Sequence, residues 1–516
     1  MISNVIAKNT LFLYFRMMLI MFVSLYTSRV ILQTLGVDDF GLYQTVGGVV
    51  ALLSFLNSAL AAGSSRFLTF ALGQNEPNNL KKTFSSVLIV HILLALAIIL
   101  VAEFFGLWFV CNKLNVPPFR MDATVFAFHF TVVSIFFTIT QVPYNASIIS
   151  HEKMSAFAYI SILEVLLRLA VAYGLLIGSF DKLKMYAVLL CIVQIGIACS
   201  YRIYCLKKFP ECRCMLVFDK TIVKNVVGFV SWNILTNTAS ALVLHGATVL
   251  TNMFYNPGVV TARAVANQVN SAATQFIENF RQASSPQIIK RFAARDYDGS
   301  KHLLIESTKI SFYMMLVLCL PIIFTSDTLL KLWLGILPEY SVSFLRLAIV
   351  TSLFIVFGRS FFIPLSANGR LKDNAISIAI SHVILLAVVF FLFRTGLSPI
   401  VLAWALLVEE FFLCLVIKPY LLVKIVGYKW SDLWMVFTPC IKVTLIAVPI
   451  PLAAFVFLQT NAFNEYARFA IMVPLSVLSV CIAVWFVGLT TEMKGFVKQI
   501  VQKMINKNTA NLPAKE

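Results

Sequence analysis

Residues 11–32 have the sequence LFLYFRMMLIMFVSLYTSRVIL, an almost unbroken apolar run of the length that a helix needs to cross a bilayer. Similar runs recur almost to the end of the chain, and no stretch between them is long enough for a soluble domain. Of the 516 residues, 60% are hydrophobic and 12% are charged, which is about half the charged share of a soluble protein. The sequence therefore predicts that the whole protein is a membrane domain.

The apolar runs are long and are separated by short polar breaks. This pattern favours helices, because the strands of a membrane barrel would show alternating segments of roughly ten residues. The predicted fold class is an all-α polytopic membrane protein with about fourteen spans. They are expected at residues 11–32, 40–62, 84–110, 121–142, 155–178, 184–205, 225–253, 259–280, 310–330, 342–365, 375–393, 398–417, 436–458 and 466–488.

The net charge of +18 indicates either a nucleic-acid partner or an orientation signal, and the location of the charges decides between them. With a cytoplasmic N-terminus, the inside segments hold 25 Lys and Arg residues and the outside loops hold 7. This bias is the positive-inside pattern, so we expect both termini in the cytoplasm and no nucleic-acid partner.

A weak internal repeat divides the predicted spans. At an offset of 220 residues Ser64 and Ser65 fall on Ser284 and Ser285, and at 221 Pro143 falls on Pro364. Repeats of this kind are typical of transporters, whose substrate sites lie between the repeats. We expect an N-terminal lobe (1–206), a cytoplasmic linker (207–224), a C-terminal lobe (225–424), an extra helix pair (425–489) and a basic cytoplasmic tail (490–516).

Residues 28–68, SRVILQTLGVDDFGLYQTVGGVVALLSFLNSALAAGSSRFL, resemble the first hairpin of oligosaccharide flippases, which move O-antigen and capsule repeat units. These flippases form the polysaccharide transporter group of the multidrug, oligosaccharidyl-lipid and polysaccharide exporter superfamily. The residues that carry the resemblance are Arg29, Gly36, Phe40, Gly41 and Arg66. Fourteen spans also occur in the related lipid II flippases.

The resemblance implies two lobes around a cavity that opens alternately to each side. The implied substrate is an undecaprenyl-pyrophosphate-linked repeat unit for surface polysaccharide, including lipopolysaccharide, in the bacterial inner membrane. Membrane lipid is then a partner, and a polysaccharide polymerase and glycosyltransferases are expected to act on the same substrate.

Charged residues inside spans are costly and are expected to be paired or to face a wet cavity. Arginine outnumbers acid among them, which suits a pyrophosphate better than a cationic drug. Arg66, Arg346, Glu409 and Glu410 lie near span ends, where reaching the interface explains them equally well. The proposed anion-binding residues are Arg16, Arg29, Arg66, Arg168, Arg263 and Arg359.

The eighth span, 259–280, is too polar to face lipid. Its side chains are expected either to bind glycan or to make hydrogen bonds between helices. The predicted glycan-binding residues are Asn267, Asn270, Gln275 and Glu278 on this span and Asn57 on the second span.

Coupling to an ion, H⁺ or Na⁺, is expected to involve Glu164 or His245, with no other cofactor and no metal. Glu164 stands four residues before Arg168, so an internal ion pair is an equal alternative. His245 is one of four histidines inside spans, which also include His382.

Enzyme motifs are lacking in the sequence: it has no phosphate-binding glycine loop, no HExxH and no nucleophile elbow. Two other functions compete with a flippase. A drug or metabolite antiporter of the same superfamily would be expected to have an acidic cavity. An integral membrane sugar polymerase or acyltransferase would be expected to have a long catalytic outer loop, and the longest predicted outside loops have only about ten residues.

Overall fold

The computed structural model of the chain describes most residues from the N-terminal helix to residue 495. The described ranges are 2–53, 64, 67–68, 71–72, 77–151, 153–177, 180–213, 238–368, 370–461, 463–491 and 493–495, with side chains placed from residue 18 onward apart from scattered positions. Asn57 and Arg66 therefore lie outside the described residues, as does the side chain of Arg16.

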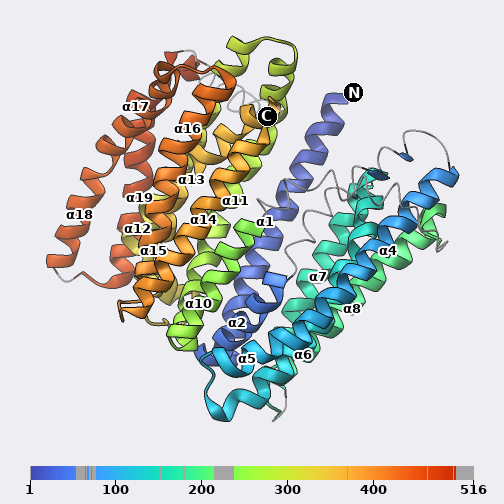
Figure 1. Cartoon of the computed structure of the whole chain (residues 1–516). Coiled ribbons are helices and arrows are strands. Elements are labelled where there is room, and N and C mark those ends of the chain that lie inside the picture. The colour runs from blue at the N-terminus through green and yellow to red at the C-terminus, as the bar shows by residue number, and fades with distance from the viewer. Residues whose placement is uncertain are drawn as a thin grey trace, which may run out of the picture. The chain divides into compact units, whose positions relative to one another are not determined.

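All secondary structure in these ranges is helical, which confirms the all-α fold (Figure 1). The first half contains α1 (Ile2–Leu35), α2 (Val37–Leu53), α4 (Pro77–Val101), η1 (Ala102–Gly106), α5 (Leu107–Lys113), η2 (Pro118–Arg120), α6 (Met121–Ser150), α7 (Met154–Gly174), α8 (Lys182–Lys208) and η3 (Pro210–Cys212). The second half contains η4 (Leu242–Gly246), α10 (Ala247–Phe254), α11 (Pro257–Ala293), α12 (Tyr297–Leu334), α13 (Ser341–Ala367), α14 (Leu371–Arg394), α15 (Val401–Phe412), η5 (Leu413–Ile417), α16 (Lys418–Leu421), η6 (Leu422–Val426), α17 (Trp430–Ala447), α18 (Pro449–Thr460), α19 (Glu465–Ala483) and η7 (Val484–Gly488).

Ten helical stretches of the described chain are long and apolar enough to cross a membrane, so the protein is a multi-pass membrane protein. Two further predicted spans, 40–62 and 225–253, fall partly outside the described residues. Of the remaining two, 259–280 lies within α11, and all but the first three residues of 398–417 lie in α15 and η5. The first is more polar than the ten because of its amide and charged residues, whereas the second is strongly apolar apart from Glu409 and Glu410.

The chain forms two compact units. Unit 1 comprises Met1–Ala272, Leu330–Leu347 and Leu371–Glu409, and unit 2 comprises Ala273–Leu329, Ala348–Arg370 and Glu410–Glu516. The predicted linker at 207–224 lies largely outside the described residues, so the division into two six-helix lobes and an extra pair stays a prediction.

The first hairpin of unit 1 depends on two glycines. Gly36 has a φ of +82°, which ends α1 and lets α2 begin one residue later. Gly41 lies against the start of α11, where an added Cβ would stand 2.0 Å from the carbonyl oxygen of Pro257. Thr261 Oγ1 donates to the Val37 carbonyl at 2.6 Å and holds the same contact. The hairpin and α11 therefore approach at backbone distance.

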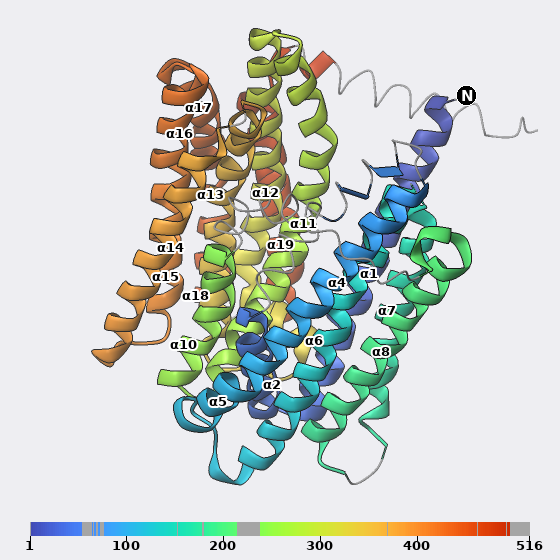
Figure 2. The same cartoon turned by 45° about the vertical axis from the view of Figure 1, so that its right-hand side comes forward.

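A helical layer of α4, α6 and α8 forms the rest of the core of unit 1. The three helices run side by side in both views (Figures 1 and 2), with α6 packed along α4 and α8. The apolar contacts around Phe128 include Val110 and Leu183, all of them almost fully buried.

Unit 2 contains a bent helix. Within α12, Thr325 has non-helical dihedrals (φ −119°, ψ 15°), one turn after Pro321. Proline lacks the amide hydrogen that a helical bond needs, and the Thr325 hydroxyl donates to the Pro321 carbonyl at 2.7 Å, which its own amide would serve in a regular helix. The Tyr313 hydroxyl, also on α12, donates to the Gly488 carbonyl at 3.2 Å, which joins α12 to the end of η7.

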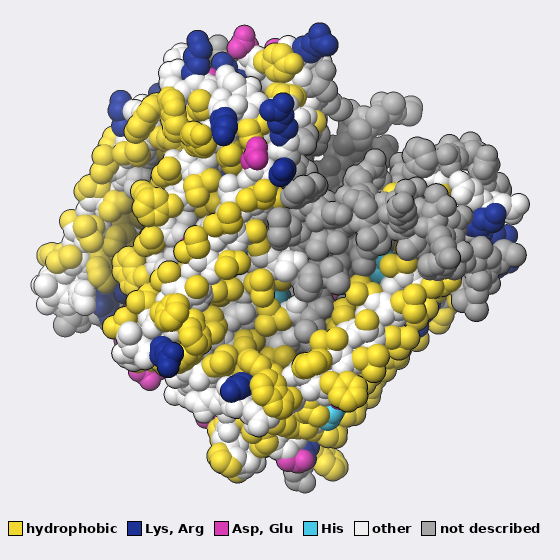
Figure 3. Space-filling model, in the orientation of Figure 1, with side chains coloured by type: hydrophobic (Ala, Val, Ile, Leu, Met, Phe, Trp, Pro, Cys, Tyr) yellow, Lys and Arg dark blue, Asp and Glu magenta, His cyan; other side chains and the backbone are white. Residues whose placement is uncertain are grey.

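The outer surface is apolar along the helices. Figure 3 shows hydrophobic side chains over the visible flanks, with Lys and Arg mainly near helix ends. Phe104, Phe105 and Phe486 expose more than two thirds of their surface. Side chains of this size are exposed in such numbers where the surrounding solvent is lipid.

Candidate functional site

Unit 1 contains a polar cavity of about 170 Å³. Its floor and walls come from five helices: α1, α2, α7, α8 and α11. Hydroxyl and amide groups predominate, together with two aromatic rings and one charge. The lining residues are Ser24, Thr27, Ser28, Ile31, Phe40, Gln44, Val165, Arg168, Tyr186, Leu190 and Gln268.

Arg168 carries the only charge among these lining residues. Its Nη2 donates to Glu164 Oε1 at 2.7 Å, one helical turn earlier on α7. The Arg168 side chain keeps 51% of its surface exposed, so the guanidinium is only partly engaged. The internal ion pair that the spacing allowed thus forms, and Arg168 also lines the cavity; its contact with substrate stays a prediction.

Gln268 shows how α11 contributes to this cavity. Its side-chain oxygen is buried and has no hydrogen-bond partner among the described residues. A buried amide oxygen without a donor is costly, so a rotation of the Gln268 side chain that brings this oxygen into the cavity would let it accept from a ligand hydroxyl. Ser28 and Gln44 add further polar groups, and Phe40 and Tyr186 add ring faces. Such a set suits a sugar, which presents hydroxyls and apolar C–H faces together.

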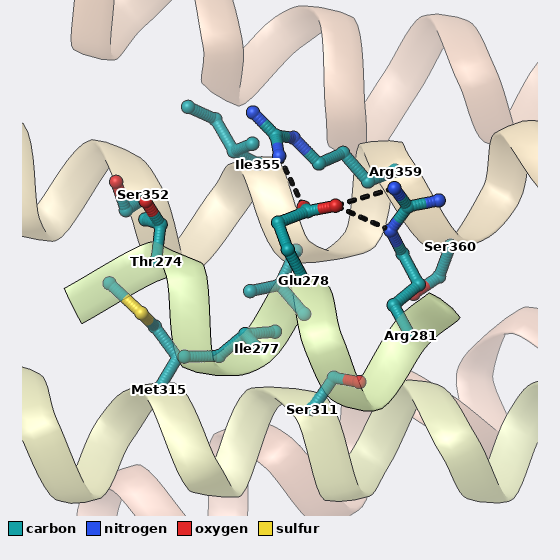
Figure 4. Close-up of a pocket in the computed structure, with 11 residues that line it drawn as sticks. Thr274, Ile277, Glu278, Arg281, Ser311, Met315, Ser352, Ile355, Arg359 and Ser360 are labelled. Atoms are coloured by element: carbon teal, nitrogen blue, oxygen red, sulfur yellow. Dashed lines mark hydrogen bonds and ion pairs between the residues drawn. The ribbon is translucent and has the colours of Figure 1, made fainter. Parts of the chain in front are cut away.

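Unit 2 contains a second, much smaller cavity of about 20 Å³, in which three charged side chains meet (Figure 4). Glu278 and Arg281 lie three residues apart on α11 and so share one helical face. Arg359 reaches the same carboxylate from α13. The other lining residues are Thr274, Ile277, Ser311, Met315, Ser352, Ile355, Val356 and Ser360.

The two guanidiniums hold different oxygens of the Glu278 carboxylate. Arg281 donates to Oε2 from Nε at 3.0 Å and from Nη2, and Arg359 donates to Oε1 from Nη1. Only 16% of the Glu278 side chain is exposed, whereas Arg359 exposes 48%. Two positive charges and one negative charge leave the cluster with a formal charge of +1.

Arg29 and Arg263 lie outside both cavities. Arg29 Nη1 donates to the Leu332 carbonyl at 3.2 Å, beside two similar contacts: Gln33 Nε2 donates to the Leu334 carbonyl at 2.6 Å, and Trp333 Nε1 donates to the Leu25 carbonyl at 2.9 Å. These bonds tie α1 to the last turn of α12 within unit 1.

Arg263 is almost fully buried, with 7% of its surface exposed. Its Nη1 donates to Thr248 Oγ1 at 2.6 Å, and both terminal nitrogens approach the Leu244 carbonyl. The half-buried His245 follows Leu244 directly in η4, within electrostatic range of the guanidinium. Substrate binding by Arg263 and coupling by His245 stay predictions.

The other predicted glycan-binding residues of α11 are not among the residues that line either cavity. Asn267 and Asn270 are half-buried, and Gln275 is exposed. Their neighbours Gln268 and Thr274 line the cavities instead. The sequence therefore predicted that α11 carries cavity-lining residues, but the residues that line the cavities can be identified only from the fold.

Sequence reasoning missed Arg281, because it begins a basic segment that was counted as an orientation signal. Its spacing of three residues from Glu278 was the available signal. Glu409 also differs from expectation. Its side chain is 7% exposed instead of reaching the interface, because Ser381 Oγ donates to it at 2.6 Å and His382 Nε2 lies 3.5 Å away.

Comparisons with known proteins identify the fold. No family model matches the chain, and no curated protein matches its sequence. Solved structures do match. The lipid II flippase MurJ in an inward closed conformation is 15% identical, with a TM-score of 0.67 over 94% of this chain and 98% of that chain.

Multidrug transporters match as well. A multidrug resistance MATE family transporter of the MOP superfamily, in an inward-facing conformation, is 14% identical, with a TM-score of 0.66 over 78% of this chain and 95% of that chain. The MATE multidrug transporter DinF-BH is 15% identical, with a TM-score of 0.55 over 80% and 96%. This chain has the fold of these transporters.

Proposed function

We propose that this protein is a flippase that moves undecaprenyl-pyrophosphate-linked oligosaccharide repeat units from the cytoplasmic to the periplasmic leaflet. It would work by alternating access in the bacterial inner membrane, with both termini in the cytoplasm. Its product would serve surface polysaccharide synthesis, of O-antigen or capsule, and would be taken up by a polymerase after glycosyltransferases have built the unit. The fold shared with a lipid II flippase, matched over 94% of this chain, supports a lipid-linked cargo.

The observation that carries this proposal is the charge of the two cavities. Arg168, which is paired with Glu164, is the only charged residue lining the first, and two arginines oppose one carboxylate in the second. The net positive charge of the second cavity favours a phosphorylated cargo, and the guanidinium fork matches phosphate oxygens in pairs. The hydroxyl and amide groups of the larger cavity suit the sugars of the same cargo.

The position of Arg359 agrees with loading from the cytoplasm. In the predicted topology α13 begins at the outer surface, and Arg359 lies 18 residues after Ser341. At 1.5 Å per residue this is about 27 Å along the helix, close to the inner boundary of a hydrocarbon core about 30 Å thick. The phosphate group of a lipid in the cytoplasmic leaflet lies at this depth.

The deciding experiment follows lipid-linked oligosaccharide in cells that lack the protein. We expect the oligosaccharide to accumulate in the inner leaflet and surface glycan to be lost. The wild-type gene should restore both, whereas Arg359→Ala and Arg168→Ala should restore them poorly. Arg29→Ala and Arg263→Ala test two of the other four predicted arginines, those whose side chains the structure describes, and exposed Arg295→Ala serves as the control.

A drug or metabolite antiporter is the second candidate, because MATE multidrug transporters share the fold. It predicts normal glycan export in the deletion strain together with sensitivity to cationic drugs. The arginine-lined cavities argue against a cationic cargo. A deletion strain with normal surface glycan and increased sensitivity to cationic drugs would refute the flippase proposal and support the antiporter.

Coupling to H⁺ or Na⁺ is part of the proposal. The buried pair of His382 on α14 and Glu409 on α15 supports a proton, because such a pair exchanges protons without exposing a charge to lipid. We expect flipping in proteoliposomes to respond to an imposed pH gradient and to lose that response in Glu409→Gln. A response to a Na⁺ gradient alone would contradict the proton.

A further inference from the structure

The unit 2 cavity is already occupied by its own anion. The Glu278 carboxylate bridges Arg281 and Arg359, and the three side chains point toward one another in Figure 4. They are the only charged groups among the residues that α11, α12 and α13 contribute to this lining. The arrangement is that of two guanidiniums sharing one small anion.

The enclosed space beside this carboxylate is small, and a cavity of about 20 Å³ holds roughly one water molecule. Glu278 already accepts from Nε and Nη2 of Arg281 and from Nη1 of Arg359. A phosphate group that accepts from the same nitrogens of both arginines therefore has to take the place of Glu278. Carboxylate and phosphate are the two anions for which the guanidinium fork is suited, so the exchange preserves the hydrogen bonds.

Such an exchange reverses the sign of the cluster. With Glu278 alone the cluster has a formal charge of +1. A pyrophosphate brings at least two negative charges and neutralises both guanidiniums, so the displaced Glu278 carboxylate has to turn toward water or take up a proton. The carboxylate in turn satisfies the arginines when cargo is absent, since a buried unpaired charge is strongly destabilising.

We propose that Glu278 is a resident counter-ion which a phosphate group of the lipid-linked cargo displaces from Arg281 and Arg359. This inference rests on the proposed function. It makes Glu278 a competitor of the cargo phosphate for Arg281 and Arg359. Binding is weakened by the energy needed to displace the carboxylate. When cargo leaves, the carboxylate returns to the arginines and opposes rebinding, which favours release.

Titration of the purified full-length protein in nanodiscs with inorganic pyrophosphate tests the exchange without transport. Glu278→Gln keeps the size of the side chain and removes the competing charge. We expect it to bind pyrophosphate at least tenfold more tightly than the wild type. Adding Arg359→Gln to this variant should abolish the gain. Glu306→Gln is the matched control, because Glu306 is a buried carboxylate of unit 2 that pairs with Lys309 and does not line the cavity.

Equal pyrophosphate affinity in the wild type and Glu278→Gln would overturn the proposal, as would an equal gain in Glu306→Gln. If Glu278→Gln does not fold, Arg359→Gln alone decides: it leaves the Glu278–Arg281 pair intact, and unchanged affinity would refute the site. Undecaprenyl pyrophosphate in the nanodisc should compete with the soluble probe. Lack of competition would overturn the assignment to a lipid-linked phosphate.

The binding result is separable from the proposed function. If purified Glu278→Gln binds pyrophosphate more tightly but cells that lack the protein export glycan normally, the exchange site stands and the flippase is refuted. Defective export with no effect of Glu278 on binding would leave the flippase standing and refute the exchange.

Discussion

The two cavities solve the problem of a polar site in a membrane in opposite ways. The cavity of unit 1 is roomy, is lined by hydroxyl and amide groups, and leaves the Gln268 oxygen without a donor among the described residues. The cavity of unit 2 is much smaller, and both of its arginines hold one carboxylate. The first has room for an added ligand, whereas a ligand that takes the same hydrogen bonds in the second has to displace Glu278. Empty space and net charge are therefore separate properties of a binding site.

The largest effect is expected from removing both arginines of the unit 2 cavity. Arg281→Gln with Arg359→Gln leaves Glu278 half-buried without a cation and should cost about 3–5 kcal/mol of stability. Adding Glu278→Gln should restore much of the stability but not transport. Unfolding in detergent and flipping in proteoliposomes measure the two. Recovery of transport in the triple variant would show that the cluster is only structural.

A smaller loss is expected from crowding the backbone contact that frames the unit 1 cavity. Gly41→Val places a side chain against the Pro257 carbonyl and should cost about 1–3 kcal/mol. At Gly47 an added Cβ would meet no atom within 4 Å, so Gly47→Ala is the control and should be neutral or slightly stabilising. Equal melting temperatures for the two variants would contradict the close approach of α2 and α11.

A change at Gln268 should separate stability from function in the unit 1 cavity. Gln268→Leu removes a buried oxygen that lacks a donor among the described residues, so we expect stability to stay level or rise by about 1 kcal/mol. Glycan export should nevertheless fall by about tenfold, the value of one hydrogen bond of roughly 1.4 kcal/mol. Unimpaired export would remove Gln268 from the proposed sugar site.

The smallest effect concerns a cluster of one arginine and two aspartates, which lies at the end of unit 1 that is predicted to face away from the cytoplasm. Arg120 bridges two acids, with Nη2 2.6 Å from Asp39 Oδ2 and Nη1 2.6 Å from Asp181 Oδ2. Burial raises the pKa of Asp181, but hydrogen bonds from Arg120 and from the Lys184 and Leu183 amides outweigh it, so the pKa lies below its ordinary value. At Asp39 burial outweighs Arg120 and raises the pKa.

The sign of the pH dependence follows from these shifts. A lowered pKa means that ionised Asp181 stabilises the fold above the ordinary value of about 4, and this stabilisation is lost as the pH falls below it. Protonation of Asp39 in the same range acts in the opposite sense, so we expect a net loss of only about 1 kcal/mol. Melting curves of the wild type and Asp181→Asn between pH 7 and 3 measure it. A steeper acid loss in Asp181→Asn would contradict this assignment.

The sequence allowed the fold class and the polar character of α11 to be predicted, because both depend on residue type and spacing. It also indicated that arginine would dominate the charged groups within the spans, and Arg168 and Arg359 do line cavities. The partner of each arginine could not be predicted. Arg29 and Arg263 resemble the other two in sequence, yet Arg29 donates to a backbone carbonyl and Arg263 donates mainly to the Thr248 hydroxyl 15 residues earlier, and neither partner is marked in the pattern of charged residues.

Each side-chain bond between α1 and the end of α12 has a main-chain oxygen as its acceptor. Arg29 and Gln33 donate to the main-chain oxygens of Leu332 and Leu334, and Trp333 donates to that of Leu25, which any amino acid at those three positions would supply. Evolution is therefore free to vary residues 25, 332 and 334 so long as their bulk fits, while the donors at 29, 33 and 333 are constrained by their chemistry. Related sequences should show drift at the acceptor positions and invariance at the donor positions.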